Sequence, residues 1–314
     1  MHPTSPSASA ATPSPEGAGD ASSAPTTGHP ATVVVARQHA VDVLTRAAVP
    51  SPEVDAELLL GHVLGLGRGA VQAAAITGRV LDAEERTVFA ELVERRASRE
   101  PLQHITGRAA FRSMELAVGP GVFVPRPETE SVVQFAIDAL RAVPIPRPIG
   151  VDLGTGSGAI ALAMATEVPN AAIYATENSV DAFIWAKQNF AESGADNATV
   201  VFEHLADAFH ELDGMVDVVI SNPPYVPDDA IPRDPEVRLY DPSAALYGGP
   251  DGLDVVRYVS ATAQRLLHRG GTLIIEHGEL QGQAIRELLT ADGWQAAATH
   301  RDLTTRDRTT IAIR

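Results

Sequence analysis

The sequence predicts an α/β protein in which a small helical domain precedes a larger domain built on a mostly parallel sheet. From residue 149 onward, short apolar runs of strand character alternate with helical patterns, which is typical of a sheet covered by helices on both faces. Residues 32–103 show only helical periodicity. Residues 104–124 contain alternating polarity and a glycine-rich turn, which predict a β-hairpin that links the two domains.

The composition limits what the protein can do. Its 314 residues are 45% hydrophobic and 20% charged, as in ordinary globular proteins. Forty acidic residues against 24 basic ones give a formal charge of −16, which disfavours direct binding to nucleic acid. The chain has no cysteine, which excludes disulfides, thiol catalysis and cysteine-ligated zinc. We find neither a membrane span nor a secretory signal, and expect a cytoplasmic protein that does not bind membranes.

The N-terminal segment 1–31 consists almost entirely of Ala, Pro, Ser, Thr and Gly, and is predicted to be a disordered tail. Apolar spacing predicts a first helix over Val33–Val49. Ser51, followed by Pro52, is placed to cap a second helix that runs through Leu66.

The rest of the helical domain is predicted to hold two more helices. A short one follows the break at Gly65–Gly69, and a longer one runs to about Arg99. Asp82 and Glu85 have the spacing of a capping box for that longer helix. A bundle of this size is better suited to recognising a partner than to chemistry.

Pro101–Gly107 is predicted to end the helices and to lead into the hairpin. Alternation between Ala110 and Val124 predicts the two strands, with the turn at Gly119–Gly121. The larger domain is predicted to span residues 125–314, and to open with a helix that ends near Val143.

The first strand of the larger domain, Ile149–Leu153, runs directly into a glycine loop before the helix that starts at Ala159. Strand, glycine loop and helix form the nucleotide-binding corner of parallel sheets. The G-x-G-x-G pattern lacks both the dinucleotide spacing and a Lys-Ser/Thr pair, and therefore favours a nucleoside ligand without phosphate. The loop residues are Gly154, Thr155, Gly156, Ser157 and Gly158.

The second and third strands end in acidic residues. Glu177 lies about 20 residues past the glycines, where a carboxylate can accept hydrogen bonds from ribose hydroxyls. A helix over Val180–Ser193 and a strand over Thr199–Glu203 follow. Asp207 and Ala208 come next, where an acid and a backbone amide could meet the edge of an adenine.

The fourth strand, Val216–Ile220, is followed by Asn222, Pro223, Pro224 and Tyr225. The two prolines hold the backbone extended and leave nearby carbonyls free to accept other bonds. With the Asn222 side chain and the Tyr225 ring, this corner suits a planar group that carries two N–H donors. A carboxamide and the exocyclic amine of a base are both such groups, although the same residues also form ordinary turns.

The remaining elements complete the alternation. A polar loop over Val226–Gly252 precedes a helix to His268, and the fifth strand is Gly270–Glu276. A helix from Glu279 and a terminal pair of strands, Trp294–His300 and Arg308–Ile313, follow. All the motifs fall at the carboxyl ends of strands, where such sheets bind ligands.

Together, these motifs resemble the class I methyltransferases that use S-adenosylmethionine to methylate amide or amino nitrogen. Further segments resemble one family closely, the peptide-chain release factor glutamine N5-methyltransferases (PrmC/HemK), over about residues 35–314. The matching segments are Pro101–Gly107, Val124–Glu130, Asp152–Gly158, Val219–Val226, Asp241–Leu246, Gly249–Gly252 and Glu276–Gly278.

The resemblance implies a seven-stranded Rossmann-like domain, S-adenosylmethionine as cofactor, no metal, and class 1 release factors as protein partners. The substrate would be the glutamine of their Gly-Gly-Gln motif, and we expect a monomer. By match, residues 154–158 contact the methionine and ribose parts of the cofactor, Glu177 the ribose hydroxyls, and Asp207 with Ala208 the adenine. Residues 222–225 hold the glutamine amide, Asn222 also borders the cofactor, and Arg126 and Glu128 bind substrate.

Three departures from the family pattern stand out: Glu177 replaces the usual Asp, Ala208 stands where some members have an aromatic residue, and Thr304-Thr305 replaces a glycine. Two related activities remain as alternatives, methylation of a ribosomal-protein glutamine and of adenine N6 in nucleic acid. A non-catalytic binding module is a third, but both main motifs are intact. No general base stands out, although His104, His204 and His277 are candidates by residue type.

Overall fold

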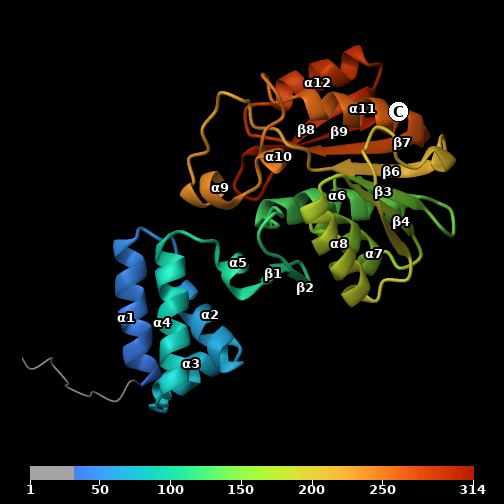
Figure 1. Cartoon of the computed structure of the whole chain (residues 1–314). Helices are drawn as coiled ribbons and strands as arrows, with labels where there is room; N and C mark the ends of the chain where they lie inside the picture. The colour runs from blue at the N-terminus through green and yellow to red at the C-terminus, as the bar shows by residue number, and fades with distance from the viewer. Residues whose placement is uncertain (1–31) are drawn as a thin grey trace, which may run out of the picture.

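A computed structural model describes residues 32–314. The segment 1–31, for which a disordered tail is predicted, lies outside the described residues. Four helices at one end of the molecule are joined through a short helix and a hairpin to a larger α/β part (Figure 1). The α/β class, the sheet of mostly parallel strands and the helices on both of its faces agree with the sequence-based prediction.

The helical region, residues 33–97, has its own apolar core. Leu44, Leu59 and Phe89 are among its buried side chains. The capping box is present: the Glu85 amide donates to Asp82, and the Asp82 amide donates to the Glu85 side chain. Ser51 stands at the predicted N-cap but makes no capping hydrogen bond through its side chain. The helices are α1 (Val33–Arg46), α2 (Pro52–Leu64), α3 (Arg68–Ile76) and α4 (Ala83–Ala97).

The connection between the two parts differs from the prediction in two ways. Pro101–Gly107 does not end the helices, because α5 (Leu102–Thr106) forms within it. The hairpin turns at Arg112 and Ser113, between β1 (Arg108–Phe111) and β2 (Met114–Ala117), and not at Gly119–Gly121. Arg112 takes a left-handed conformation there, with φ of 52°.

Partners distant in sequence hold this hairpin. The Arg112 guanidinium pairs with Glu167, and its backbone amide donates to Glu130. The position of the turn is therefore set by side-chain contacts from two other helices, and the glycine pattern used for the prediction gave the wrong position. Gly119, beyond the hairpin, instead packs against Trp185, whose ring would lie 2.5 Å from a Cβ at that position.

Seven strands form one sheet in the order β5-β4-β3-β6-β7-β9-β8. The first five strands in this order are parallel, while β9 runs antiparallel to both β7 and β8. The strands are β3 (Ile149–Leu153), β4 (Ala172–Glu177), β5 (Ala198–Phe202), β6 (Val216–Ser221), β7 (Leu267–Glu276), β8 (Gln295–Arg301) and β9 (Asp307–Ile313).

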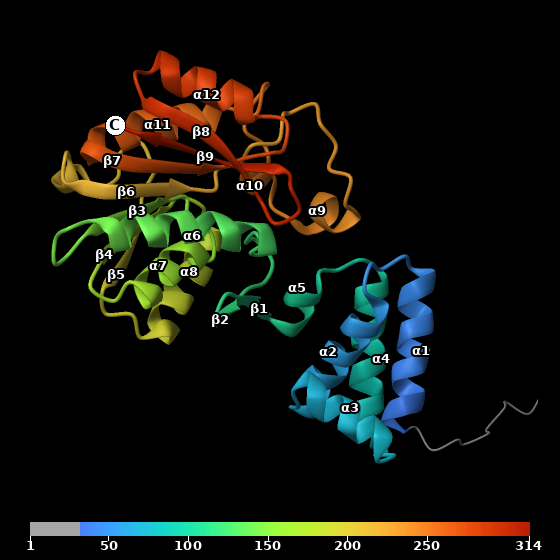
Figure 2. The ribbon, with the colours of Figure 1, turned by 180° about the vertical axis from the view of Figure 1, so that it is seen from behind.

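Two apolar cores cover the faces of the sheet. Three helices lie on one face and two on the other (Figures 1 and 2). Ile173, Val218 and Ile274 point to the first core, and Val151, Val219 and Leu273 point to the second, as strand alternation requires. The helices on the first face are α6 (Pro127–Ala142), α7 (Ala159–Glu167) and α8 (Val180–Ser193), and those on the second are α11 (Asp254–Leu266) and α12 (Gly282–Ala291).

The segment predicted as a polar loop, Val226–Gly252, contains two short helices, α9 (Pro235–Tyr240) and α10 (Ser243–Leu246). A short 3-10 turn, η1 (His210–Leu212), precedes β6. Asp234 caps α9 and Pro235 occupies its first turn, so the sequence did hold a helix signal. In both views α9 extends from the α/β part toward the end of α4 (Figure 2).

Across residues 32–314, no single helix is long and apolar enough to cross a membrane. Only α2 and α3 taken together meet the length and composition of a span, and they are bent by 91° where they meet.

Candidate active site

A cavity of about 730 Å³ opens at the carboxyl ends of β3, β4 and β6. Its size suits a ligand of nucleoside dimensions together with a substrate side chain. The predicted site residues that line it are Arg126, Glu128, Gly154, Thr155, Gly156, Ser157, Glu177, Asn222, Pro223, Pro224 and Tyr225.

The glycine loop takes a conformation that requires glycine. Gly154, Gly156 and Gly158 have φ of 77°, 58° and 90°, where other residues are strained. The amides of Gly154 and Thr155 both donate to the Thr176 carbonyl, at 3.0 and 2.9 Å, which fixes the loop against β4. Gly158 also packs closely, since a Cβ there would lie 2.9 Å from the Phe190 ring.

Glu177 is anchored by backbone amides. Its Oε2 accepts from Gly156 at 2.8 Å, and its Oε1 accepts from Asn178 and Ser179 at 2.9 and 2.8 Å. These bonds occupy three of the roughly four lone-pair positions of a carboxylate and leave room for a hydroxyl donor. The carboxylate thus ties the glycine loop to the end of β4 and still borders the cavity.

Asp152, beneath the glycine loop, is fully buried. Its Oδ2 accepts from the Thr155 hydroxyl at 2.6 Å and from the Ala161 amide at 3.2 Å, while Oδ1 has no partner among the described residues. Burial raises the pKa of Asp152 to about 7, against the lowering effect of those bonds. Asp152 begins one of the segments that resemble the family, but the sequence predicted no role for it.

The predicted adenine contacts differ from the arrangement in the structure. Asp207 is exposed, Ala208 is buried in the core, and neither is among the described residues that line the cavity. His204 and Leu205 from the same loop line it instead, and Tyr258 of α11 faces His204 edge-on. Asp207 and Ala208 therefore lie in a loop that reaches the cavity through residues three positions earlier.

The Asn-Pro-Pro-Tyr corner begins where β6 leaves the sheet. The Ser221 hydroxyl donates to the Leu153 carbonyl at 2.7 Å and joins the ends of β6 and β3. Asn222 Nδ2 lies 3.5 Å from the Thr129 hydroxyl of α6, so the amide nitrogen of Asn222 faces that helix. Within residues 32–314, no hydrogen bond reaches the Pro223 carbonyl.

Glycines and one glutamine support the corner from behind. A Cβ at Gly248 would lie 2.4 Å from the Pro224 carbonyl, and one at Gly252 would lie 2.3 Å from the Tyr225 carbonyl. Gln281 Nε2 donates to that Tyr225 oxygen at 2.8 Å. The glycines near residue 250 are therefore needed for close backbone approach, and Gln281 was missed because nothing local in the sequence marks it.

Two titratable groups beside the corner are perturbed by burial. Burial, followed by the charge of Glu276, raises the pKa of Tyr225 to about 12, so this phenol stays protonated. Burial also raises the pKa of Glu276, at the end of β7, to about 7. Tyr225 offers the cavity a neutral aromatic ring with a hydroxyl.

Arg126 and Glu128 enter the cavity from the start of α6. Arg126 stacks over the Phe123 ring at 4.8 Å and donates to Asp241 at 2.6 Å. Burial raises the pKa of Asp241 to about 6, although the Arg126 charge opposes that rise. The guanidinium therefore holds the end of α9, and Glu128 lines the cavity and makes no ion pair with the other residues of 32–314.

The chain is similar to known proteins over most of its length. A family model described as the PrmC N-terminal domain matches residues 36–107, and one described as the methyltransferase small domain matches residues 114–239. A protein of Streptomyces coelicolor, named release factor glutamine methyltransferase, is 48% identical over 267 residues, which are 84% of this chain and 92% of that protein. The chain belongs to the release factor glutamine methyltransferase family.

Other members of this methyltransferase family match at similar length. One from Bifidobacterium longum is 43% identical over 280 residues, covering 86% of this chain and 95% of its own length. One from Deinococcus radiodurans is 44% identical over 266 residues, covering 84% and 92%. The family resemblance found in the sequence motifs is thereby confirmed.

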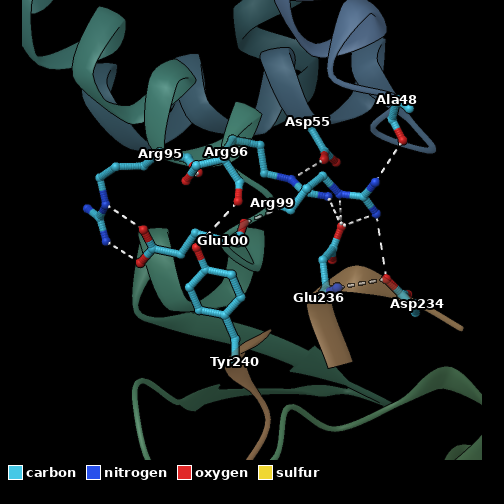
Figure 3. Close-up of polar contacts among 10 residues, drawn as sticks. Ala48, Asp55, Arg95, Arg96, Arg99, Glu100, Asp234, Glu236 and Tyr240 are labelled. Carbon is cyan, nitrogen blue, oxygen red and sulfur yellow. Dashed lines mark hydrogen bonds and ion pairs between the residues drawn. The ribbon is translucent and has the colours of Figure 1, made fainter. Parts of the chain in front are cut away.

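In this methyltransferase, Arg96 of α4 and Arg99, just beyond the end of that helix, reach across to the segment that borders the cavity (Figure 3). Arg96, almost fully buried, donates to Asp55 of α2 at 2.7 Å and to Glu236 of α9 at 2.8 Å. Arg99 also donates to Glu236, at 3.0 Å, and lies 3.5 Å from Asp234. Asp234 lines the cavity, so the helical region is connected directly to its rim.

The three candidate histidines of the methyltransferase differ in setting. His277 is buried, with Nε2 bonded to the Thr310 hydroxyl and Nδ1 close to the Gly278 carbonyl. His104 is buried in α5 and, among the described residues, does not line the cavity. Burial lowers the pKa of both. Of the three, His204 alone lines the cavity, on the loop that follows β5.

Proposed function

We propose that this chain transfers a methyl group from S-adenosylmethionine to the side-chain amide N5 of the glutamine in the Gly-Gly-Gln motif of class 1 release factors. The observation that carries this proposal is the Asn-Pro-Pro-Tyr corner, which presents an amide side chain, an unoccupied proline carbonyl and an aromatic ring beside a nucleoside-sized cavity. Membership of the release factor glutamine methyltransferase family supports the same substrate.

The residues of the cavity fit S-adenosylmethionine. Gly154 and Gly156 present bare backbone to open space, since a Cβ added at either would have no neighbour within 4 Å, so a ligand can approach closely. Glu177 has an acceptor position left for a ribose hydroxyl. His204 and Leu205 are better placed than Asp207 and Ala208 to border an adenine. When bound, the cofactor supplies a methyl group activated by its sulfonium.

The corner residues act on the glutamine amide. Its nitrogen is a poor nucleophile because the lone pair is delocalised into the carbonyl. Asn222 Oδ1 and the Pro223 carbonyl would accept its two N–H bonds, which fixes the amide plane and stabilises the positive charge that develops on nitrogen. The Tyr225 ring would stack on the amide, and its high pKa keeps it uncharged throughout the working pH range.

The wider organisation follows from this activity. We assign release factor recognition to the helical region together with Arg126 and Glu128 at the cavity rim, and chemistry to residues 125–314. The division into domains 32–103, 104–124 and 125–314, the monomeric state and the cytoplasmic location belong to the same proposal. The acidic surface, with a formal charge of −16, favours a protein acceptor over nucleic acid.

The proposal is tested by peptide mass spectrometry of a recombinant release factor incubated with this protein and S-adenosylmethionine. We expect one added methyl group on the Gly-Gly-Gln glutamine. The Asn222→Ala variant should lose that product, while Asn170→Ala, which removes an exposed amide outside the cavity lining, should retain it. An unmodified release factor, despite calorimetric binding of cofactor, would overturn the proposal and direct the search to ribosomal protein and adenine acceptors.

A further inference from the structure

Glu276 stands at the last position of β7, beside the corner that is proposed to hold the glutamine. Ser221 pairs with Ile275 in parallel register, so Asn222, which follows β6, and Glu276, the last residue of β7, are neighbours on the same face. Glu276 is 2% exposed and lines the cavity. The glutamine clamp therefore has a buried carboxyl group next to it.

The surroundings of Glu276 are only partly complementary to its charge. Its Oε2 is buried and has no hydrogen-bond partner within residues 32–314. Burial raises its pKa, whereas the nearby Thr129 hydroxyl, the Arg308 charge of β9 and the nearby Asn222 amide lower it. Glu128 of α6 adds a like charge.

Arg308, the cation whose charge lowers the pKa of Glu276, is already engaged elsewhere. Arg308 donates to Asp302 at 3.4 Å and to the His277 carbonyl at 3.2 Å. Tyr225, with a protonated phenol, is the remaining titratable group that feels the charge of Glu276. Within the part of the chain that the structure describes, Glu276 is thus a carboxyl group without an ion pair, and the neighbouring donors are the Thr129 hydroxyl and the Asn222 amide.

The proposed chemistry places a strict demand on Asn222. Its side chain has an oxygen on one side and an NH₂ group of nearly equal size on the other, and only the oxygen can accept the substrate N–H. The orientation is decided by what lies behind the amide. Thr129 can accept one N–H through its hydroxyl at 3.5 Å, but a hydroxyl can donate as readily as it accepts.

We propose that Glu276 is a positioning residue that, with Thr129, holds the NH₂ group of Asn222 away from the substrate and so presents Oδ1 to the glutamine amide. An ionised carboxylate only accepts hydrogen bonds. It therefore favours the orientation in which the Thr129 hydroxyl hydrogen and the Asn222 NH₂ group point toward Glu276. This inference rests on the proposed function and names a residue that determines how its clamp is set.

The first test replaces the carboxylate with an amide in Glu276→Gln. A glutamine there can donate to Asn222 Oδ1 and stabilise the reversed orientation, so we expect kcat to fall about tenfold to hundredfold. KM for the release factor and the dissociation constant of S-adenosylmethionine should change by less than about twofold. Glu287→Gln, which removes an exposed carboxylate of α12, is the matched control and should behave as wild type.

The pH profile gives a readout that a merely structural role does not move. Because burial raises the pKa of Glu276 to about 7, the wild-type kcat should rise through that pH as the carboxylate ionises. In Glu276→Gln this rise of kcat with pH should be absent. Burial also raises the pKa of Asp152 to about 7. If kcat of Glu276→Gln still rises with pH as in wild type, the rise belongs to Asp152 or another group, and the inference about Glu276 is overturned.

Stability provides a second readout that needs no substrate. The folded pKa of Glu276 lies above its usual value of 4.5, so ionisation of this group destabilises the fold progressively as pH rises from about 4.5 through 7. Glu276→Gln should therefore gain melting temperature relative to wild type at pH 8 and lose that gain near pH 4.5. Loss of turnover together with gain of stability identifies a group retained for positioning.

The outcomes separate this inference from the proposed function. If wild type methylates the release factor and Glu276→Gln does so at the same rate with the same pH profile, Glu276 has no positioning role, while the function stands. The Glu276→Asp variant keeps a group that only accepts hydrogen bonds. A turnover rate above that of Glu276→Gln in this variant would support the positioning role of Glu276. If wild type leaves the release factor unmodified, the proposed function fails, and the pH dependence of stability still reports whether Glu276 is a strained, ionisable group.

Discussion

The two sides of the cavity are built differently. On the cofactor side, Gly154, Thr155 and Gly156 are fixed by hydrogen bonds to Thr176 and Glu177, which follow within about one βαβ unit. On the substrate side, the corner at residues 222–225 is held by glycines near residue 250 and by Gln281, and the neighbouring rim segment, α9, is paired through Glu236 with Arg96 of the helical region.

Because of this difference, we expect substitutions on the two sides to have different effects. On the cofactor side, the hydrogen bonds that shape the glycine loop come mostly from residues within about 25 positions along the chain. The substrate side depends on contacts between residues up to 140 positions apart. We therefore expect changes on the cofactor side to appear in cofactor affinity, and changes on the substrate side to appear in turnover or in KM for the release factor.

The largest effect should come from Gly252→Ala. The new Cβ would lie 2.3 Å from the Tyr225 carbonyl, and this backbone has φ of 72°, so the corner must shift. A displacement of about 1 Å at a reacting group costs about a hundredfold in rate, and we expect kcat to fall by that order. Cofactor affinity by calorimetry should be nearly unchanged.

Gly293→Ala is the matched control for that experiment. Gly293 has φ of 91° and nothing within 4 Å of a Cβ position, so it reports the backbone strain without the collision. Equal losses of kcat in both variants would show that strain, and not displacement of the corner, is responsible. A large loss of cofactor affinity in Gly252→Ala would remove the contrast between the two sides.

An intermediate effect is expected for Glu177→Gln on the cofactor side. Its new NH₂ group would face an N–H donor of either Gly156 or the Asn178–Ser179 turn, where Glu177 now accepts from both. We expect about a tenfold weaker affinity for S-adenosylmethionine, with kcat at saturating cofactor changed by less than about threefold. The measurement is calorimetric titration beside steady-state kinetics.

Glu203→Gln is its control, because Glu203 is exposed and follows the neighbouring strand. If the dissociation constant of S-adenosylmethionine is unchanged in Glu177→Gln, Glu177 does not contact the cofactor as proposed. A fall in kcat at saturating cofactor as large as the fall in affinity would instead mean that the two sides are coupled.

The smallest effect is expected for Glu236→Gln. Arg96 keeps Asp55 and Arg99 keeps Asp234, so the loss of one charge should lower the free energy of unfolding by only about 1 kcal/mol. The segment that carries Asp234 and Val237 along the cavity is then less ordered, and KM for the release factor should rise about threefold to tenfold. Cofactor affinity should not change.

Glu91→Gln, an exposed position on the same helix as Arg96, serves as the control for charge alone. Chemical denaturation and kinetics at several release factor concentrations give both quantities. A change in kcat without a change in KM would show that the helical region acts on the chemical step and not on binding.

The sequence predicted the local half of this site better than the distant half. The glycine loop, Glu177 and the strands around them lie where the pattern placed them, because period, turn chemistry and capping are properties of neighbouring residues. The Asp82 capping box is confirmed for the same reason. The Asn222 corner was found from its two prolines, which mark it without any knowledge of what surrounds it.

The errors share a cause. The hairpin turn lies at Arg112 and not at Gly119–Gly121, because pairing with Glu130 and Glu167 fixes a residue that has no turn preference. Gln281 and Glu236 were missed because each acts through a partner far away in the chain. Their roles could be inferred only once the partners were placed.

The sharing of Arg96 between two carboxylates has a mechanical consequence. Asp55 belongs to the same helical region as Arg96, and Glu236 belongs to the cavity rim. When the rim moves away, Arg96 stays paired and Glu236 passes into water, so separation strands no unpaired charge in a dry interior. A separation of the helical region from the rim would therefore break the pairs that Glu236 makes and leave the buried pair inside the helical region intact.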